Sequence, residues 1–437
     1  MKVTFYTLGC KVNQYETQAL EQLLRSRGHE IAPFPGPADA YVINTCSVTA
    51  VSDQKSRQAV HRIRREHPSA VVAVCGCYVQ THPEQARALG ADLIAGTGDR
   101  LGFAELLENA ARTAAQRDGA PAAPAEALDN SLRRREFEVL PAGGLESRTR
   151  AMLKVEDGCV NFCSYCIIPY ARGPVRSEPA ETAAEQAREL AGAGYRELVV
   201  TGIEISSWGR DLPGNPELTE LLRAVCTAVP DTRVRLGSLE PRTVTEAFCR
   251  TAAALPNLCP QFHLSLQSGC DATLRRMNRK YDTARYLQSV ELVHRFYDRP
   301  AVTTDLITGF PGETEEEFEA TLAFLRRCGF AQMHVFPYSV RPGTPAAAME
   351  QLPRPVREER ARRASALAAE LHADYLAGCV GSVLPVLFEQ PSGGLFSGRA
   401  PNYMEVLAEG EGLHNVLRDV KITGTDGKVL LGEILEG

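Results

Sequence analysis

Between residues 149 and 376 the chain repeats one pattern six times: a short apolar run of strand character, followed in most repeats by a helical segment. The expected strands are residues 151–156, 197–201, 233–237, 261–266, 302–308 and 332–336. Strands that alternate with helices are typical of parallel sheets built from βαβ units. Six units predict a partial (βα)6 barrel rather than a closed barrel of eight, with its chemistry where the strands end.

A compact group of three cysteines follows the first of these strands. Cys159, Cys163 and Cys166 have the spacing Cys-x3-Cys-x2-Cys, and no fourth cysteine lies nearby. Cubane iron–sulfur clusters are normally held by four thiolates, so three thiolates leave one iron open to another ligand. An open coordination position marks a catalytic metal site, and its natural occupant here is the amino-carboxylate end of S-adenosylmethionine (SAM).

A zinc site is the alternative for these cysteines. The pair Cys163 and Cys166 could belong to a zinc knuckle, which would need a second pair of ligands at a typical spacing downstream. The next cysteine, Cys226, and the next histidine, His263, each stand alone. The sequence therefore favours an iron–sulfur cluster, and a noncatalytic, zinc-containing RNA-binding protein stays as the alternative.

The first 115 residues show the same alternation of strands and helices, which predicts a doubly wound parallel sheet. Its strands are expected at residues 2–8, 40–44, 70–74 and 92–95. Cys10, Cys46 and either Cys75 or Cys77 follow three of these strands. Because the carboxyl ends of parallel strands meet at one crevice, three thiols there predict a second metal site.

The remaining segments have a different composition. Residues 116–148 combine an Ala/Pro-rich run with Arg133, Arg134 and Arg135, which predicts a linker with a basic patch. For these arginines a solvated charge run is favoured over RNA contact. A long helix is expected at residues 355–376, and short β-prone runs between Gly and Asn turns in residues 377–437 predict a small antiparallel β-barrel.

The net charge of −6 argues against wholesale nonspecific binding of nucleic acid, which needs many phosphate-neutralising cations. Any RNA contact must be local, and Arg276, Arg279 and Lys280 form one candidate group, with a solvated face as the alternative. No apolar run approaches the roughly 20 residues that span a bilayer, and no secretory signal pattern is seen. We therefore expect a cytoplasmic protein with no membrane partner, in which clustered cysteines indicate metal binding.

Several motifs resemble the radical SAM methylthiotransferase family. They are the cysteine triplet with residues 166–173 (CIIPYARG), and residues 8–17 (LGCKVNQYET), 263–269 (HLSLQSG), 277–280 (MNRK) and 337–345 (PYSVRPGTP). The resemblance covers the whole α/β multidomain chain. It implies an N-terminal methylthiotransferase domain (1–115), a linker (116–148), a radical SAM domain (149–376) and a C-terminal TRAM domain (377–437).

The resemblance also implies two [4Fe–4S] clusters and SAM as cofactors. Cys159, Cys163 and Cys166 would hold the cluster that binds SAM. Cys10, Cys46 and Cys77 would hold an auxiliary cluster, with Cys77 chosen over Cys75 because the family pattern is Gly-Cys followed by Tyr or a similar residue. Contacts with the cofactor are expected from residues at the ends of the barrel strands: Gly202, Glu204, Ser265, Gln267 and Gly309.

Residues 8–17 are most similar to the branch of the family that acts on N6-threonylcarbamoyladenosine in tRNA, whereas relatives that act on isopentenyladenosine or on a ribosomal protein carry different residues after Cys10. The implied reaction adds a methylthio group to C2 of N6-threonylcarbamoyladenosine at position 37, beside the anticodon. The implied partners are the anticodon stem-loop of tRNA and an electron donor such as flavodoxin or ferredoxin. The same chemistry on another tRNA adenosine or on a ribosomal protein is the alternative within the family.

Overall fold

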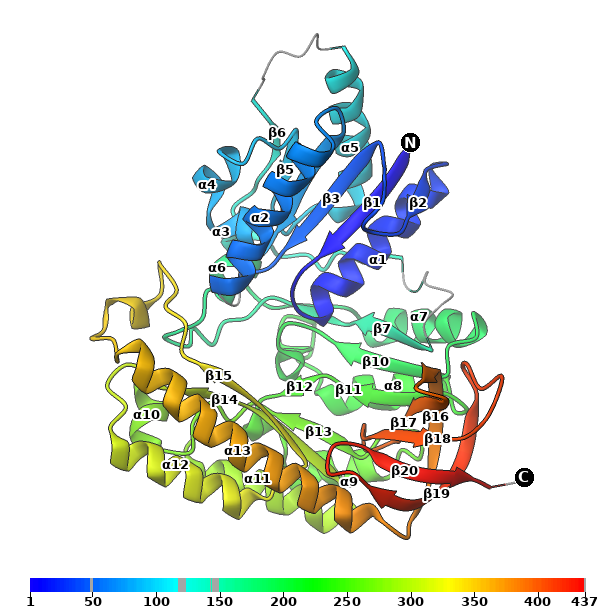
Figure 1. Ribbon diagram of the computed structural model, residues 1–437, viewed down its shortest axis with the longest axis vertical. Helices are drawn as coiled ribbons and strands as arrows, with labels where there is room; N and C mark the ends of the chain where they lie inside the picture. The colour runs from blue at the N-terminus through cyan, green and yellow to red at the C-terminus, as the bar shows by residue number, and fades with distance from the viewer. Residues whose placement is uncertain (48–49, 117–122, 142, 144–148, 436–437) are drawn as a thin grey trace.

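The computed structural model describes residues 1–47, 50–116, 123–141, 143 and 149–435. Three bodies make up the molecule (Figure 1): a sheet with helices on both faces at the N-terminus, an open arc of strands below it, and a small barrel beside that arc. None of the helices in these ranges combines the length and apolar character needed to cross a bilayer.

The N-terminal sheet has the strand order β2-β1-β3-β4-β5-β6, and every neighbouring pair is parallel. The strands are β1 (Lys2–Thr7), β2 (Glu30–Ala32), β3 (Ala40–Thr45), β4 (Val71–Gly76), β5 (Leu93–Ala95) and β6 (Ala125–Ala127); the helices are α1 (Lys11–Ser26), α2 (Ala50–Glu66), α3 (Cys77–Thr81), α4 (Pro83–Arg87) and α5 (Arg100–Ala115). One apolar cluster joins the sheet to α1 and α5, and another joins its opposite face to α2 and α3. The predicted doubly wound sheet is confirmed.

The segment expected to be a linker is partly built into the fold. Residues 125–127 form β6, which extends the sheet beside β5, and a 3-10 helix, η1 (Ser131–Arg133), follows. The Arg134 guanidinium donates hydrogen bonds to Asp129 Oδ2 (2.6 Å) and Thr97 Oγ1 (2.7 Å). The linker is therefore shorter than the expected 116–148. The sequence pattern misses β6 because a strand of three residues at the sheet edge is too short to show an alternation of apolar and polar residues. Within the expected linker, residues 117–122, 142 and 144–148 lie outside the described residues.

The second body is an arc of parallel strands in two sheets, with orders β11-β10-β7 and β12-β13-β14-β15. Its strands are β7 (Arg150–Lys154), β10 (Glu197–Thr201), β11 (Arg233–Leu236), β12 (Ser238–Leu239), β13 (Gln261–Leu264), β14 (Ala301–Thr308) and β15 (Gln332–Pro337), with a two-stranded pair β8 (Glu156–Asp157) and β9 (Arg176–Ser177). The chain passes from one sheet to the other at Gly237, between β11 and β12. This is the predicted partial barrel, and all six expected strands are present.

Helices cover the outside of the arc (Figure 1). They are α7 (Ala180–Gly192), α8 (Leu218–Ala228), α9 (Glu246–Ala253), α10 (Asp271–Arg276), α11 (Thr283–Phe296), α12 (Glu315–Cys328) and α13 (Arg354–Cys379); the 3-10 turns are η2 (Ile205–Ser207), η3 (Pro241–Thr243) and η4 (Pro345–Ala348). The largest apolar cluster lies between these helices and the strands. The strand ends therefore stay free to carry polar loops. The short helix α6 (Ile168–Arg172) lies instead beside α3, at the boundary with the N-terminal domain (Figure 1).

The C-terminal body is a closed barrel with the order β16-β17-β18-β20-β19. Its strands are β16 (Val383–Ser392), β17 (Leu395–Arg399), β18 (Glu405–Ala408), β19 (Leu417–Thr425) and β20 (Leu430–Ile434). The small barrel is as predicted, but β18 and β20 run parallel while the other pairs are antiparallel. A closed ring with an odd number of strands cannot alternate direction throughout, so at least one pair must be parallel.

Two arginines of β11 hold the C-terminal barrel against the arc. Arg233 donates to the carbonyl oxygen of Pro385 (3.1 Å) and Arg235 to that of Pro401 (2.8 Å). Both guanidiniums also pair with the buried carboxylate of Glu197. The contact therefore joins charged side chains of the arc to backbone acceptors of the barrel.

Candidate active site

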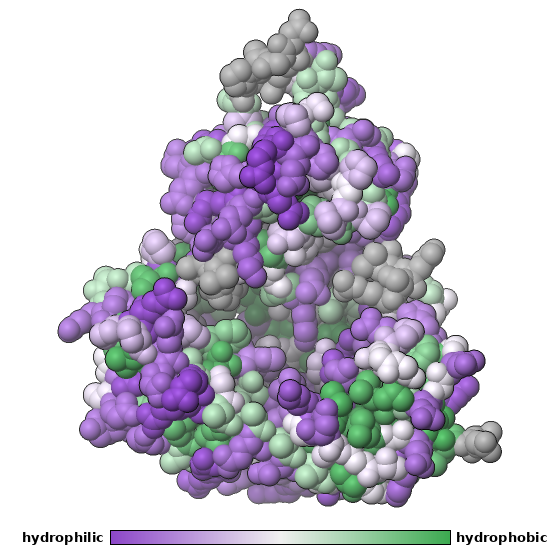
Figure 2. All heavy atoms as spheres, in the orientation of Figure 1, coloured by the Kyte–Doolittle hydropathy of each residue, from purple (hydrophilic) through white to green (hydrophobic). Residues whose placement is uncertain are grey.

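A cavity of about 420 Å³ lies where the strand ends of the arc face the N-terminal domain. Its wall contains Cys159, Cys163 and Cys166, together with Cys10 from the N-terminal domain. Four of the five expected cofactor-contact residues also line it: Gly202, Glu204, Ser265 and Gln267. The surface is visibly hollowed between the upper and lower parts of the molecule (Figure 2). The volume falls in the range of about 300–1,000 Å³ that is usual for small-molecule sites.

The loop that carries the cysteine triplet is fixed at both ends. Gly158 precedes it at φ +93°, and a Cβ there would lie 2.0 Å from the carbonyl oxygen of Pro174, so only glycine fits. Ser164, inside the triplet, donates a hydrogen bond to the carbonyl oxygen of Arg276 (2.8 Å). The three thiols are therefore held by a loop whose path is set by backbone contacts.

Burial makes two thiols of the triplet, those of Cys159 and Cys166, poor acids in the absence of a cation. Desolvation raises the pKa of Cys159, and it raises the pKa of Cys166 to about 12. The Arg279 guanidinium donates to the sulfur of Cys163 (3.2 Å) and to the carbonyl oxygen of Ser265 (3.3 Å). Since the thiolate is the form that binds metal, these buried thiols suit a cationic metal centre.

The thiols are not arranged around a single point. In the described ranges, no three His, Cys, Asp or Glu side chains are placed to hold one metal ion. A cubane distributes its thiolates over separate irons, whereas a zinc knuckle gathers four donors at about 2.3 Å or less from one ion. The donor set of three thiolates fits an iron–sulfur cluster.

Two carboxyl groups meet beside Gly202 at the end of β10. The N–H of Glu204 donates to Glu156 Oε2 (2.7 Å), and a Cβ on Gly202 would lie 2.6 Å from the same oxygen. Burial raises the pKa of Glu156 and of Glu204. Glycine at position 202 therefore makes room for a desolvated carboxyl pair that a bound cationic group, such as an ammonium, would neutralise.

Gln267 and Gly309 occupy different surroundings. Gln267 lies at φ +68° and lines the cavity, and its N–H donates to the carbonyl oxygen of Asp305 (2.9 Å). Gly309 does not line the cavity: a Cβ there would lie 2.5 Å from Arg357 Cγ of α13. The structure therefore brings Gln267 to the expected site, and it places Gly309 where the β14–α12 turn passes under α13.

The second group of cysteines gathers at the carboxyl ends of β1, β3 and β4. Cys10 directly precedes α1 and is exposed, Cys46 follows β3, and Cys77 opens α3; Cys46 and Cys77 are each 3% exposed. A Cβ on Gly9 would lie 2.7 Å from Cys46 Cβ, so the loop of Cys10 packs closely against Cys46. These are the neighbouring strand ends where the sequence predicts a second site.

The two groups of cysteines face each other across the domain boundary. Burial raises the pKa of Cys77, and a hydrogen bond from Arg172 of the arc opposes that rise. Cys77 in turn adds to the raised pKa of Cys166, after burial and Cys163. Cys10 lines the same cavity as the triplet. Thiols from separate domains therefore belong to one connected site.

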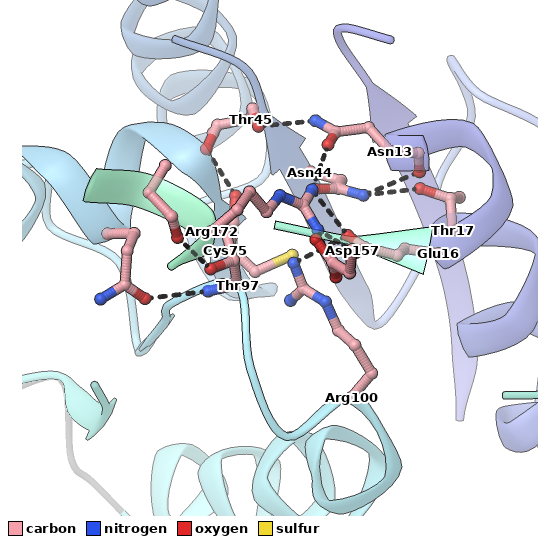
Figure 3. A network of polar contacts seen from close by, with 12 residues as sticks. Asn13, Glu16, Thr17, Asn44, Thr45, Cys75, Thr97, Arg100, Asp157 and Arg172 are labelled. Atoms are coloured by element: carbon pink, nitrogen blue, oxygen red, sulfur yellow. Dashed lines mark hydrogen bonds and ion pairs between the residues drawn. The ribbon is translucent and has the colours of Figure 1, made fainter. Parts of the chain in front are cut away.

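The structure separates Cys75 from Cys77. Cys75 is a β4 residue with no exposed surface, and it belongs to the apolar cluster under α5. Burial raises the pKa of Cys75, and the Arg100 side chain, which hydrogen-bonds to it, opposes the rise (Figure 3). The side chain of Cys75 therefore points into the core, one strand residue before the chain turns towards the cavity.

A buried network of charges supports the loops of the second cysteine group (Figure 3). Its centre is Glu16 of α1, which pairs with Arg172, with Arg100 (3.1 Å) and with Lys154 (3.6 Å). Arg172 also donates to Asn13 Oδ1 (2.8 Å). Burial would raise the pKa of Glu16, but the three cations outweigh it and lower the pKa to about 2. Glu16 is thus an anion that ties the N-terminal domain to the arc.

Arg276, Arg279 and Lys280 do not form one exposed basic group. Arg276 is half-buried and pairs with Glu317, while Arg279 lies in the cavity beside Cys163. Lys280 is exposed, and its ammonium donates to Asn278 Oδ1 (2.7 Å). Of the three positions expected to contact RNA, only Lys280 has its charge on the open surface.

The fold and the site are those of a radical SAM enzyme. Residues 153–325 match the radical SAM superfamily, and residues 2–96 match the family described as uncharacterized protein family UPF0004. The threonylcarbamoyladenosine tRNA methylthiotransferase of Bacillus subtilis is 39% identical over 419 residues, which cover 93% of this chain and 90% of that protein. The chain therefore belongs to the methylthiotransferase family of radical SAM enzymes.

Two further relatives and one solved structure agree with this assignment. The enzyme of the same name from Thermotoga maritima is 33% identical, covering 89% of this chain and 86% of the relative. A tRNA-2-methylthio-N(6)-dimethylallyladenosine synthase from Maricaulis maris is 32% identical, with 98% and 96% covered. The radical SAM methyltransferase TsrM from Kitasatospora setae shares the fold, with a TM-score of 0.56, 15% identity, and 90% and 79% of the chains covered.

Proposed function

We propose that this protein adds a methylthio group to C2 of N6-threonylcarbamoyladenosine at position 37 of tRNA. The observation that carries the proposal is that Cys10, from the N-terminal group of cysteines, lines the same cavity as Cys159, Cys163 and Cys166 of the arc. Sulfur insertion at an aromatic C–H bond requires both a radical source and a sulfur source. The names of the relatives, two of them threonylcarbamoyladenosine tRNA methylthiotransferases, support the choice of base.

The two cysteine groups would hold the two clusters. Cys159, Cys163 and Cys166 would hold the [4Fe–4S] cluster that binds SAM. Cys10, Cys46 and Cys77 would hold the auxiliary [4Fe–4S] cluster. When bound, the first cluster with SAM and one electron would supply a carbon-centred radical, the auxiliary cluster would present the sulfur or methylthio group, and a second SAM would supply the methyl group. An electron donor such as flavodoxin or ferredoxin would deliver the electron to the cluster that binds SAM. A tRNA substrate and a requirement for reduced thiols would place the protein in the cytoplasm.

The residues around the cavity would bind and orient the reactants. Glu204, which lines the cavity, would accept hydrogen bonds from the ammonium group of SAM, and the buried Glu156 would hold the Glu204 loop by accepting its backbone N–H. Arg279 would hold the thiolate of Cys163 in place. The N-terminal domain, through the loop of Cys10, would cover the cavity and exclude water, which protects a radical from side reactions.

Metal and sulfide analysis tests the assignment of the clusters. Protein reconstituted without oxygen is expected to hold about eight irons and eight sulfides, and about four of each after Cys163→Ala or Cys77→Ala. Cys226→Ala, in a buried cysteine remote from both groups, is the control and should keep all eight. Zinc without labile sulfide would instead support the zinc-containing RNA-binding protein.

The modified nucleosides of a deletion strain test the substrate. The 2-methylthio derivative of threonylcarbamoyladenosine should be missing, its precursor should accumulate, and the wild-type gene should restore the product. Loss of the methylthio derivative of dimethylallyladenosine would move the activity to that base. An unchanged nucleoside profile, together with a changed mass of a ribosomal protein, would move it to a protein side chain.

A further inference from the structure

A second cavity, of about 680 Å³, lies where all three domains meet. Lys11 and Gln14 come from the N-terminal domain, Arg150 from β7, and Tyr403 from the C-terminal barrel. Lys11 also lines the active-site cavity, one residue after Cys10. Lys11 therefore lies between the cysteine thiols of the active-site cavity and this second cavity at the domain junction.

Most cations that line these two cavities already have partners. Arg235 pairs with Glu197 (2.8 Å), and Arg150 pairs with Glu389 (3.0 Å). Both guanidiniums also lie over the ring of Tyr403, at 4.6 Å and 5.2 Å from its centroid. The charges of Arg150 and Arg235 are therefore already paired at the junction between the arc and the C-terminal barrel.

A third arginine, Arg279, lines the active-site cavity, and its guanidinium donates a hydrogen bond to Cys163. Lys11 differs from the three arginines. Its side chain lines both cavities, and no hydrogen bond or ion pair joins its ammonium to another described residue. The cavity walls partly desolvate this ammonium, so an anion carried by a ligand would stabilise it.

The substrate of the proposed reaction carries such an anion. Threonylcarbamoyladenosine has a free carboxylate on the group attached to N6, and N6 and the reacting C2 lie on the same edge of the purine, separated by N1 and C6. When C2 faces the cluster site, the carboxylate must therefore emerge next to the reacting edge. Cys10 and Lys11 are adjacent in the chain, with Cα atoms about 3.8 Å apart, so the ammonium of Lys11 can meet a group that emerges there.

We propose that Lys11 binds the carboxylate of the threonylcarbamoyl group and thereby selects this base over adenosines whose N6 substituent is uncharged. The inference rests on the proposed function. A pocket that pairs a charged ligand group rejects analogues that lack it far more strongly than an apolar pocket rejects an extra group. One lysine at the cavity wall would thus carry much of the discrimination.

Binding measurements on a matched pair of ligands test the inference. One synthetic anticodon stem-loop carries threonylcarbamoyladenosine, and the other carries the same group with its carboxylate replaced by a carboxamide. Dissociation constants are measured by fluorescence anisotropy on anaerobic protein with both clusters assembled. The wild type should bind the carboxylate form roughly 10- to 100-fold more tightly, the range for a hydrogen bond to a charged group.

Lys11→Met should bind both stem-loops equally, close to the wild-type affinity for the carboxamide, and Lys11→Arg should keep a preference for the carboxylate. Lys2→Met is the matched control, because Lys2 lies at the opposite end of β1 and pairs with Glu30. It should keep the wild-type ratio. Unchanged iron content in all variants shows that the cysteine loop has folded.

Three results would overturn the inference. Equal weakening of both stem-loops in Lys11→Met would mean that Lys11 contacts a phosphate of the RNA backbone. A raised dissociation constant for SAM, with the stem-loop ratio unchanged, would mean that it contacts the carboxylate of SAM. A wild-type ratio near one would mean that no cation reads the group. If the wild type instead fails to methylthiolate the carboxylate stem-loop, the proposed function is what fails.

Discussion

Removal of Arg172 should weaken the contact between the N-terminal domain and the arc and lower the free energy of unfolding. Arg172→Met keeps the length of the side chain but takes one cation from the fully buried Glu16 and breaks the hydrogen bond to Asn13. Loss of one partner of a buried ion pair costs about 3–5 kcal/mol. Because Arg100 and Lys154 still neutralise Glu16 in part, we expect a value near the lower end, about 3 kcal/mol.

Thermal unfolding of the metal-free protein, followed by circular dichroism, measures this loss. A loss of about 3 kcal/mol corresponds to a fall in Tm of roughly 6–12 °C for a cooperative unit of about 150–250 residues, which is the size range of the arc. The double variant with Glu16→Gln should lose less than the sum of the two single variants, because the contact between Arg172 and Glu16 is then lost only once. Arg354→Met, which breaks an exposed pair with Glu358 on α13, is the control and should leave Tm unchanged. A Tm for Arg172→Met that matches this control would refute the reasoning.

Three further predictions concern single side chains. Cys75→Ala should keep the full iron content while Cys77→Ala loses about half, since only Cys77 lies at the domain boundary; equal losses in elemental analysis would contradict the separation of the two thiols. Burial raises the pKa of Glu178 to about 8, and neither of its oxygens has a hydrogen-bond partner among the described residues. The folded state therefore keeps a proton that the unfolded state releases, and stability should fall as pH rises from about 4.5 to 8. Glu178→Gln should remove that fall, so its Tm advantage over the wild type should grow across this range; a constant difference would rule out Glu178 as the cause. Gly202→Ala should weaken SAM binding in equilibrium dialysis by displacing Glu156, whose Oε2 would lie 2.6 Å from the new Cβ, and wild-type affinity would show that the pair is not part of the cofactor site.

The sequence predicts the elements of this fold well where the period is clear and the strands are long. All six arc strands and the sheet strands β1, β3, β4 and β5 occur within a few residues of their expected positions. In the N-terminal sheet and the arc it misses β2, β6, β9 and β12. The first two are three-residue strands at the edges of the N-terminal sheet, and the last two have two residues each. Such strands are defined by their neighbours in the sheet and carry little pattern of their own.

The residues of the candidate site could likewise be predicted only where the order of strands and helices determines their position. The topology of a parallel sheet brings Cys10, Cys46 and either Cys75 or Cys77 to one edge, and this could be inferred from the alternation of strands and helices. The choice of Cys77 came from the family pattern. That Arg279 faces a thiol and not solvent could not be inferred, because a charged residue next to other charged residues has no periodicity that gives its direction. The position of Lys11 at the wall of two cavities depends on how separate domains are placed, which no local pattern encodes.

The way in which Arg233 and Arg235 hold the C-terminal barrel has a consequence for evolution. Both arginines are bound to main-chain oxygens of Pro385, Arg399 and Pro401, and every amino acid supplies such an oxygen. Substitutions at these positions of β16, β17 and the turn after β17 therefore leave the acceptors in place. The side chains of the barrel can diversify while its attachment to the arc is kept.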